Sequence, residues 1–185
     1  RDSGVSKVFM PNIDDTTVEA MLNVCTAYKG YCFPMIGFHP TSVGADSLFR
    51  IYEMKKLLSG EHPFVAVGEV GMDLYWDKTY LKEQQKALDI QIQWALEYHL
   101  PLVLHCREAF PELFEVMEPY KKTELSGIFH SFTGTLEEAG QVLEYARFFF
   151  GINGDVTFKK SSLAEVLPHI PLDRIVLETD SPYLA

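Results

Sequence analysis

The stretch FVAVGEVGMD, residues 64–73, decides the fold. Residues 64–67 form a short apolar run rich in β-branched side chains, which predicts a buried strand. Gly68 ends this run and Glu69 follows at once. Because a carboxylate beside a buried strand is costly unless another group pairs with it, we expect Glu69 to have a specific partner.

The same arrangement of an apolar strand followed by a metal-binding side chain recurs three times downstream. In a parallel barrel, the functional groups lie at the carboxyl ends of the strands. Imidazole nitrogen and carboxylate oxygen together suit zinc, manganese, iron or magnesium. Taken singly, each histidine could be a hydrogen-bonded loop residue and Glu69 a salt-bridge partner; taken together, the four positions predict a metal centre. They are Glu69, His105 after LPLVL, His130 after GIF and Asp180 after IVLET.

Strand-like and helix-like patterns alternate along the chain, which indicates βαβ units and a parallel sheet. We expect Asp14 and Asp15 to cap the first helix, Pro111 to fit a first turn, and Thr135 with Glu138 to form a capping box. The predicted strands are residues 5–10, 31–38, 64–67, 100–104, 125–129, 147–152 and 174–179. The predicted helices are residues 16–28, 47–58, 79–98, 109–120, 135–145 and 161–169.

This order predicts an α/β fold, a TIM-type (β/α)8 barrel, as one domain over residues 1–185. Such a barrel usually needs about 250 residues and eight strands. We therefore expect the barrel to be incomplete, with a first strand–helix unit and a last helix absent from this chain. An open doubly wound sheet is the alternative, although the glycine-rich phosphate loop of that fold is missing from the sequence.

Composition restricts the kind of partner. The chain has a formal net charge of −10 and a pI near 5.0, which argues against broad nonspecific affinity for nucleic acid or anionic membranes. Bound divalent cations would reverse the field locally, so a nucleic-acid substrate remains compatible. The three cysteines show no CxxC spacing and the first residues have no signal-peptide layout, so we expect a cytoplasmic protein. No apolar run approaches the ~20 residues of a membrane span, so we expect no membrane association. We also expect no stable protein partner.

Further candidates lie next to the predicted metal ligands, and we assign three of them, His39, Arg107 and Asp73, to substrate binding. His39 follows the second strand and should face the same mouth, although it could equally be an ordinary loop histidine. Arg107 could clamp a phosphate, against the alternative of a surface salt bridge. Asp73 could orient a ligand or cap a loop. Tyr75 and Trp76 could stack on a base or simply pack at the barrel rim.

Five short motifs resemble those of the TatD family of metal-dependent deoxyribonucleases. The resemblance extends through essentially the whole chain, in the right order, and HSFTG together with ETDSPYL is its most specific part. The family's DxHxH-like motif on the first strand has no counterpart in this sequence. The motifs are IGFHP (36–40), GEVGMD (68–73), LHCRE (104–108), HSFTG (130–134) and ETDSPYLA (178–185).

The resemblance implies a barrel-fold hydrolase with two divalent metal ions, of which Mg, Mn and Zn are candidates. It implies that Glu69, His105, His130 and Asp180 bind the metal ions and that Glu69 bridges them. The expected activity is cleavage of phosphodiester bonds in DNA by a metal-activated water, and the expected substrate is single-stranded. Glu69 and Asp180 would be the catalytic residues, with Asp180 accepting the proton.

Two other functions remain open from the sequence. A related metallohydrolase acting on a small amide, ester or phosphate ester would use the same metal ligands, because the walls around a site rather than the metal decide the substrate. A catalytically silent scaffold could keep the same residues as architecture. Tests against single-stranded DNA and small chromogenic esters separate the three.

Overall fold

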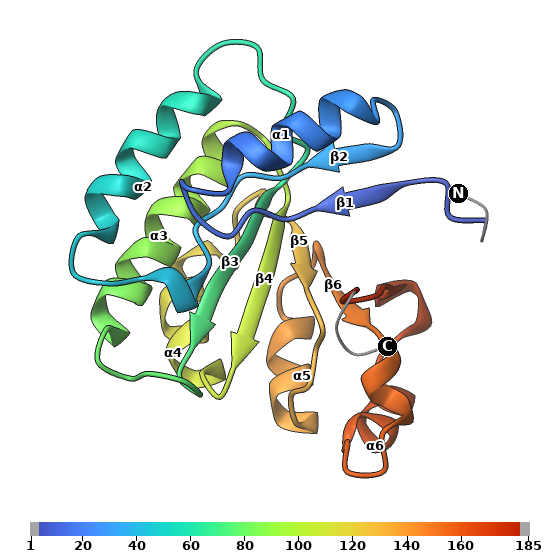
Figure 1. Ribbon diagram of the computed structural model, residues 1–185. Coiled ribbons are helices and arrows are strands. Elements are labelled where there is room, and N and C mark those ends of the chain that lie inside the picture. Colours follow the sequence, from blue (N-terminus) through green and yellow to red (C-terminus); the bar gives the residue numbers. More distant parts are fainter. Residues whose placement is uncertain (1–3, 182–185) are drawn as a thin grey trace.

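The structure is a computed structural model that describes residues 4–181. Within this range strands alternate with helices, and the paired strands run parallel (Figure 1). The strands are β1 (Val8–Met10), β2 (Cys32–Pro34), β3 (Val67–Asp73), β4 (Leu102–Arg107), β5 (Gly127–Phe129), β6 (Phe148–Ile152) and β7 (Ile175–Leu177). The predicted α/β class is therefore confirmed.

Each predicted helix is present, with shorter bounds than the sequence pattern suggested. Three of them continue as a short 3₁₀ helix, which explains the longer predicted ranges. Thr135 and Glu138 form the predicted capping box, and Pro111 lies in the first turn of its helix. The helices are α1 (Val18–Ala27), α2 (Ser47–Lys55), α3 (Leu81–Glu97), α4 (Phe110–Met117), α5 (Leu136–Leu143) and α6 (Leu163–Val166).

The capping role expected of Asp14 and Asp15 was wrong. Thr17 is the residue before α1, and the helix has no side-chain cap. The Asp14 carboxylate instead accepts a hydrogen bond from the Thr16 backbone N–H at 2.9 Å, and Asp15 binds Arg50 of α2. The Asp14 carboxylate is thus used within the turn before the helix, whereas Asp15 connects that turn to α2.

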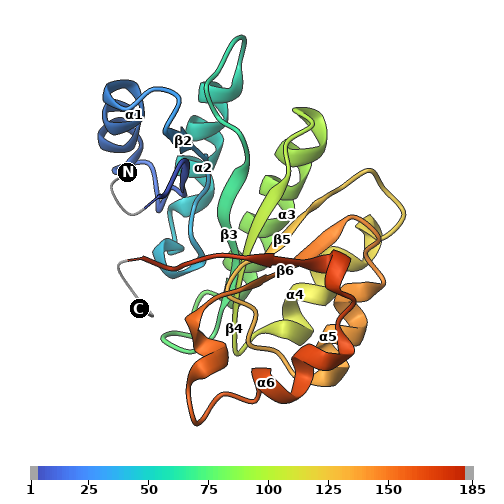
Figure 2. The same ribbon diagram turned by 90° about the vertical axis from the view of Figure 1, so that its right-hand side faces the viewer.

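The strands form one parallel array in sequence order. Strands β3 to β7 make a five-stranded sheet, β1 pairs with β2, and a single bridge between Ile36 and Val67 joins the two parts. In the part of the chain that the structure describes, β1 and β7 each pair with a strand on one side only. Figure 2 shows the carboxyl end of β7, in dark red, on the same side of the molecule as β1, in dark blue. This is the open form of a TIM-type barrel, as the sequence predicted.

Strand β3 is the point at which the two parts of the array join. All seven of its residues are buried, as expected for a parallel strand covered on both faces. Helices α3 and α4 contact it, and α2 packs against α3 (Figure 1). The predicted strand at residues 64–67 was misplaced, because β3 begins at Val67 and runs on to Asp73.

Gly71 allows β3 and β4 to approach closely. Its φ is 144°, and a Cβ built there would lie 1.9 Å from the His105 carbonyl oxygen.

We expect Gly71→Ala to lower the free energy of unfolding by about 3 kcal/mol or more, because the backbone of β4 would have to shift. Urea unfolding followed by circular dichroism measures this. Gly140→Ala is the matched control: it lies within α5 with nothing within 4 Å of the added Cβ, and it should stabilise by about 0.5–1 kcal/mol. Equal effects of the two changes would contradict this account.

Candidate metal centre

Glu69 lies inside β3 rather than beyond its end, at an irregularity of the sheet. Gly68 pairs with Val103 and Val70 pairs with Leu104, so Glu69 is an extra residue between two consecutive pairs. Such a bulge re-aims a side chain and is common beside functional sites. Here the Glu69 carboxylate faces His105, which itself lies within β4 rather than after it.

The His105 ring is held between two carboxylates. Its Nδ1 lies 3.1 Å from Glu69 Oε1 and its Nε2 lies 2.8 Å from Asp73 Oδ2. The other Asp73 oxygen, Oδ1, accepts hydrogen bonds from the backbone N–H groups of Tyr75 and Trp76 at 3.0 and 3.4 Å. A carboxylate on one ring nitrogen is the usual way to orient a metal-binding histidine. The Asp73 carboxylate therefore contacts both the His105 ring and the loop at Tyr75 and Trp76.

His39 completes a compact group with Glu69 and His105. Its Nε2 lies 3.8 Å from Glu69 Oε1, while its Nδ1 contacts Thr41 Oγ1 at 2.7 Å. One ligand atom from each of His39, Glu69 and His105 lies within 4.8 Å of the other two. Two imidazole nitrogens and a carboxylate oxygen form a donor set that suits a divalent transition metal. The sequence assigned His39 to substrate binding, whereas this position supports a role as a ligand.

His130 lies in a second group with two acidic residues. Its Nδ1 is 2.9 Å from Glu178 Oε2 and its Nε2 is 3.2 Å from Asp180 Oδ1. Glu178 also accepts a hydrogen bond from the Ser131 backbone N–H at 2.5 Å. The arrangement repeats that of His105: one carboxylate holds a ring nitrogen while the other nitrogen faces a candidate ligand.

Glu178 is a site residue that the sequence reasoning missed. It stood in the ETDSPYLA motif, two residues before Asp180, but received no role. Gly151 was the other signal, because a Cβ at this position would lie 2.3 Å from Glu178 Oε1. The glycine on β6 thus makes room for the carboxylate that holds His130.

Charges within the two groups support one another. Burial alone would raise the pKa of Glu69, but hydrogen bonds from His105 and His39 outweigh it and hold that pKa well below its usual range. Burial alone would lower the pKa of His105, yet its bonds to Asp73 and Glu69 raise it to about 9. For His130, burial is likewise outweighed by Glu178 and by the charge of Glu69, which raise its pKa to about 9. Because His130 responds to Glu69, the two groups form one electrostatic unit.

A family model described as "TatD related DNase" matches residues 1–185. This chain belongs to the TatD-related DNase family. The 3′-5′ ssDNA/RNA exonuclease TatD of Pantoea sp. (strain At-9b) is 33% identical over 186 residues, which cover 100% of this chain and 71% of that protein. The uncharacterized metal-dependent hydrolase YabD of Bacillus subtilis (strain 168) is 31% identical, over 97% of this chain and 70% of its own length.

Solved structures of the family share the fold. The TatD homolog YJJV from Escherichia coli K12 superposes with a TM-score of 0.84 at 27% identity, covering 98% of this chain and 70% of that one. A TatD family hydrolase from Entamoeba histolytica gives a TM-score of 0.78 at 24% identity, covering 99% of this chain and 63% of that one. The family resemblance expected from the motifs is confirmed. Among residues 4–181, every helix is too short or too polar to cross a lipid bilayer.

Arg107, the candidate phosphate clamp, lies at the end of β4 beside these groups. Its guanidinium carbon is 3.7 Å from the centroid of the Tyr75 ring and 5.5 Å from that of Trp76. Within the described part of the chain it makes no ion pair, so the alternative of a surface salt bridge finds no partner there. Arg107 is exposed and held by aromatic rings, which leaves its N–H groups free to bind an anion.

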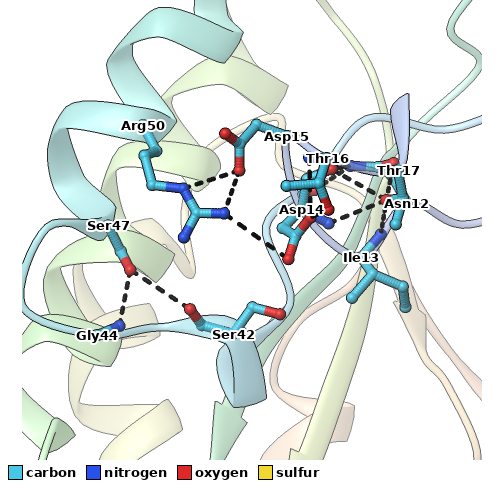
Figure 3. A network of polar contacts seen from close by, with 11 residues as sticks. Asn12, Ile13, Asp14, Asp15, Thr16, Thr17, Ser42, Gly44, Ser47 and Arg50 are labelled. Carbon is cyan, nitrogen blue, oxygen red and sulfur yellow. Dashed lines mark hydrogen bonds and ion pairs between the residues drawn. The ribbon is translucent and has the colours of Figure 1, made fainter. Parts of the chain in front are cut away.

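Asn12 is a second residue that the sequence reasoning missed, and it fixes the backbone around Glu69. Its N–H donates to the Gly68 carbonyl at 3.1 Å and its own carbonyl accepts from the Glu69 N–H at 3.3 Å. Its side chain is 1% exposed, donates to the carbonyls of Asp14 and Gly37 at 2.8 Å each, and accepts from Thr17 Oγ1. Figure 3 shows this network together with the Arg50 contacts that join it to α2.

We expect Asn12→Ala to destabilise the chain by about 2–3 kcal/mol, because it leaves buried backbone carbonyls without their donor. Thermal unfolding with added and removed metal measures the change. Asn23→Ala makes the same chemical change at an exposed position of α1, where alanine is the better helix former, and should not destabilise. An Asn12→Ala protein as stable as Asn23→Ala would show that the network does not support the site.

Proposed function

We propose that this chain is a divalent-metal-dependent hydrolase that cleaves phosphodiester bonds of single-stranded DNA. The observation that carries the proposal is the compact group of His39, Glu69 and His105, in which the charge of the buried Glu69 carboxylate also helps to raise the pKa of His130. The name of the Pantoea relative, a 3′-5′ ssDNA/RNA exonuclease, supports the choice of substrate. RNA is accordingly a second substrate to test.

The residues present fit a metal ion by their chemistry. We propose that His39, Glu69 and His105 hold one divalent ion, that His130 and Asp180 hold a second, and that Glu69 is shared. Mg, Mn and Zn are the candidate ions, since all accept such nitrogen and oxygen donors. When bound, such ions activate the attacking water and polarise the phosphate. Asp73 and Glu178 orient His105 and His130 through the ring nitrogen that does not face the metal.

Asp180 is the best-placed proton acceptor. Its side chain is 36% exposed, against 11% for Glu69 and 18% for Glu178. One of its oxygens contacts His130, and the exposure leaves the carboxylate accessible to water entering with the substrate. A carboxylate in this position can take the proton that the water loses as it attacks phosphorus.

Arg107 would bind a phosphate of the substrate. The chain as a whole carries a formal net charge of −10, which repels a polyanion at long range. A cation at the site is therefore needed in addition to the metal ions. Arg107 provides one, and its planar fork matches two phosphate oxygens.

Cleavage of a labelled single-stranded oligonucleotide with magnesium or manganese, before and after EDTA, tests the proposal. We expect cleavage that EDTA stops and that returned metal restores. A panel of small chromogenic esters and phosphate esters is assayed in parallel. Cleavage that resists EDTA would remove the metal mechanism, and turnover of the small esters without cleavage of DNA or RNA would replace the nuclease by the related metallohydrolase.

A further inference from the structure

A cavity of about 210 Å³ opens beside the metal centre. Its lining includes Pro40, Thr41, Asp73, Trp76 and Tyr80. Two parts of this lining are tied to the metal centre. Pro40 and Thr41 directly follow His39, and Thr41 contacts the His39 ring at 2.7 Å; Asp73 holds His105. A group bound in the cavity would therefore lie next to whatever occupies the metal centre.

The walls of the cavity suit a flat ring. Trp76 and Tyr80 supply aromatic surface, and Trp76 is 71% exposed. The Trp76 backbone is fixed by the Asp73 carboxylate, the same group that holds His105. The volume is below the ~300–1,000 Å³ typical of pockets for drug-sized ligands, so it fits one part of a nucleotide rather than a whole dinucleotide.

The charged side chains that line the cavity decide which part of a nucleotide it can bind. Asp73 and Asp77 both line the cavity, and carboxylates repel a phosphate. A neutral base is not repelled in this way, and it carries N–H donors for the exposed Asp77 carboxylate and a π-face for the aromatic rings. The cation Arg107 lies against the Tyr75 ring at 3.7 Å and is 5.5 Å from the centroid of Trp76, and the two rings pack edge-on with their centroids 4.8 Å apart. A base stacked on Trp76 would therefore lie next to the cation that could bind its phosphate.

We propose that this cavity is a nucleobase subsite, in which the base of the nucleotide next to the cleaved phosphate stacks on Trp76. The proposal rests on the proposed function and adds to it the recognition of the substrate. A base must leave its helix stack to enter such a cavity, and an unpaired strand meets that requirement at the lowest cost. The subsite therefore provides a physical reason for selecting single strands.

The test uses the fluorescence of Trp76 in metal-free protein, where no cleavage occurs. The chain has two tryptophans, and Trp94 is 1% exposed, so a soluble quencher such as acrylamide reports mainly on Trp76. Deoxyadenosine carries a base without phosphate, and 2-deoxyribose 5-phosphate carries the phosphate without a base. We expect deoxyadenosine to protect Trp76 from the quencher and the sugar phosphate to leave it unprotected.

Variants extend the test to activity. Trp76→Ala should lower kcat/KM on a single-stranded oligonucleotide by about 5- to 150-fold, the usual loss for one stacked base, and Trp76→Phe should restore most of it. Because Trp76 is exposed, the fold should not change. Tyr28→Ala removes another exposed aromatic side chain, 53% exposed and close to the amino end of β2, and should leave cleavage unchanged.

The outcomes separate the two proposals. If neither deoxyadenosine protects Trp76 nor Trp76→Ala weakens metal-dependent cleavage, the subsite is wrong while the nuclease assignment stands. If the sugar phosphate protects Trp76 and deoxyadenosine does not, the cavity binds phosphate and the subsite is again wrong. If deoxyadenosine protects Trp76 but no nucleic acid is cleaved, base binding stands and the nuclease assignment fails.

Discussion

Replacing Glu69 by glutamine should lower turnover of a single-stranded oligonucleotide by about 10³-fold or more, a loss comparable to that of a key electrostatic group in an active site. The Glu69 carboxylate faces both His39 and His105, and its charge helps to raise the pKa of His130. Glutamine keeps the size of the side chain but removes its charge. A neutral amide is also a poor bridge between two cations, so both proposed metal positions are weakened at once.

The fold of the Glu69→Gln protein should persist. Burial alone would raise the pKa of Glu69, but its histidine partners hold the pKa well below the usual range. Such a carboxylate contributes stability above its unfolded pKa, and glutamine loses that contribution at neutral pH. We therefore expect an unchanged circular dichroism spectrum together with a lower melting temperature in EDTA.

Glu97→Gln is the matched control for Glu69→Gln. Glu97 lies at the last residue of α3, away from the site, where its carboxylate pairs with Lys55 on the surface. An exposed ion pair of this kind contributes little to stability, and the variant should cleave at the wild-type rate. Wild-type turnover by Glu69→Gln, measured with the same oligonucleotide and metal, would refute the assignment of Glu69 even if the chain is a nuclease.

The order of elements was predictable from the sequence, and the candidate site residues could be identified there, because both depend on local patterns. An apolar run that ends in histidine or a carboxylate identifies a buried parallel strand and the polar group at its carboxyl end. The depth of Glu69 and His105 within their strands was not predictable in this way. The bulge at Glu69 arises from its pairing with β4, and a register exists only between two strands.

Glu178 and Asn12 escaped prediction for a related reason. Each acts on a residue distant in sequence: Glu178 on His130 and Asn12 on the peptide before Glu69. A single sequence does not show which of its distant residues pair with one another, because that pairing depends on how the strands are arranged in the folded chain. The sequence placed His39 at the same end of the strands as the other candidate residues, but its distance from Glu69 is a property of the folded chain.

Asp73→Asn should weaken metal binding by about 10- to 100-fold, the usual loss when the partner of a metal-binding histidine is removed. The Asp73 carboxylate uses both oxygens, one for His105 and the other for the loop at Tyr75 and Trp76. An asparagine has one acceptor oxygen. Its NH₂ group must therefore face either the His105 N–H or the loop N–H groups, and one of the two contacts is lost.

Metal affinity without substrate is the quantity that decides the role of Asp73, measured by titrating Mn²⁺ against a chelating indicator. If Asp73 positions His105, the affinity falls; if it binds substrate directly, as one sequence interpretation held, KM rises while metal affinity stays unchanged. Asp173→Asn is the control, since this exposed aspartate lies before β7, at the opposite end of the strand from Asp180. Because Asp73 is almost fully buried and already fully hydrogen-bonded, we expect the fall in metal affinity, with KM changing less than kcat.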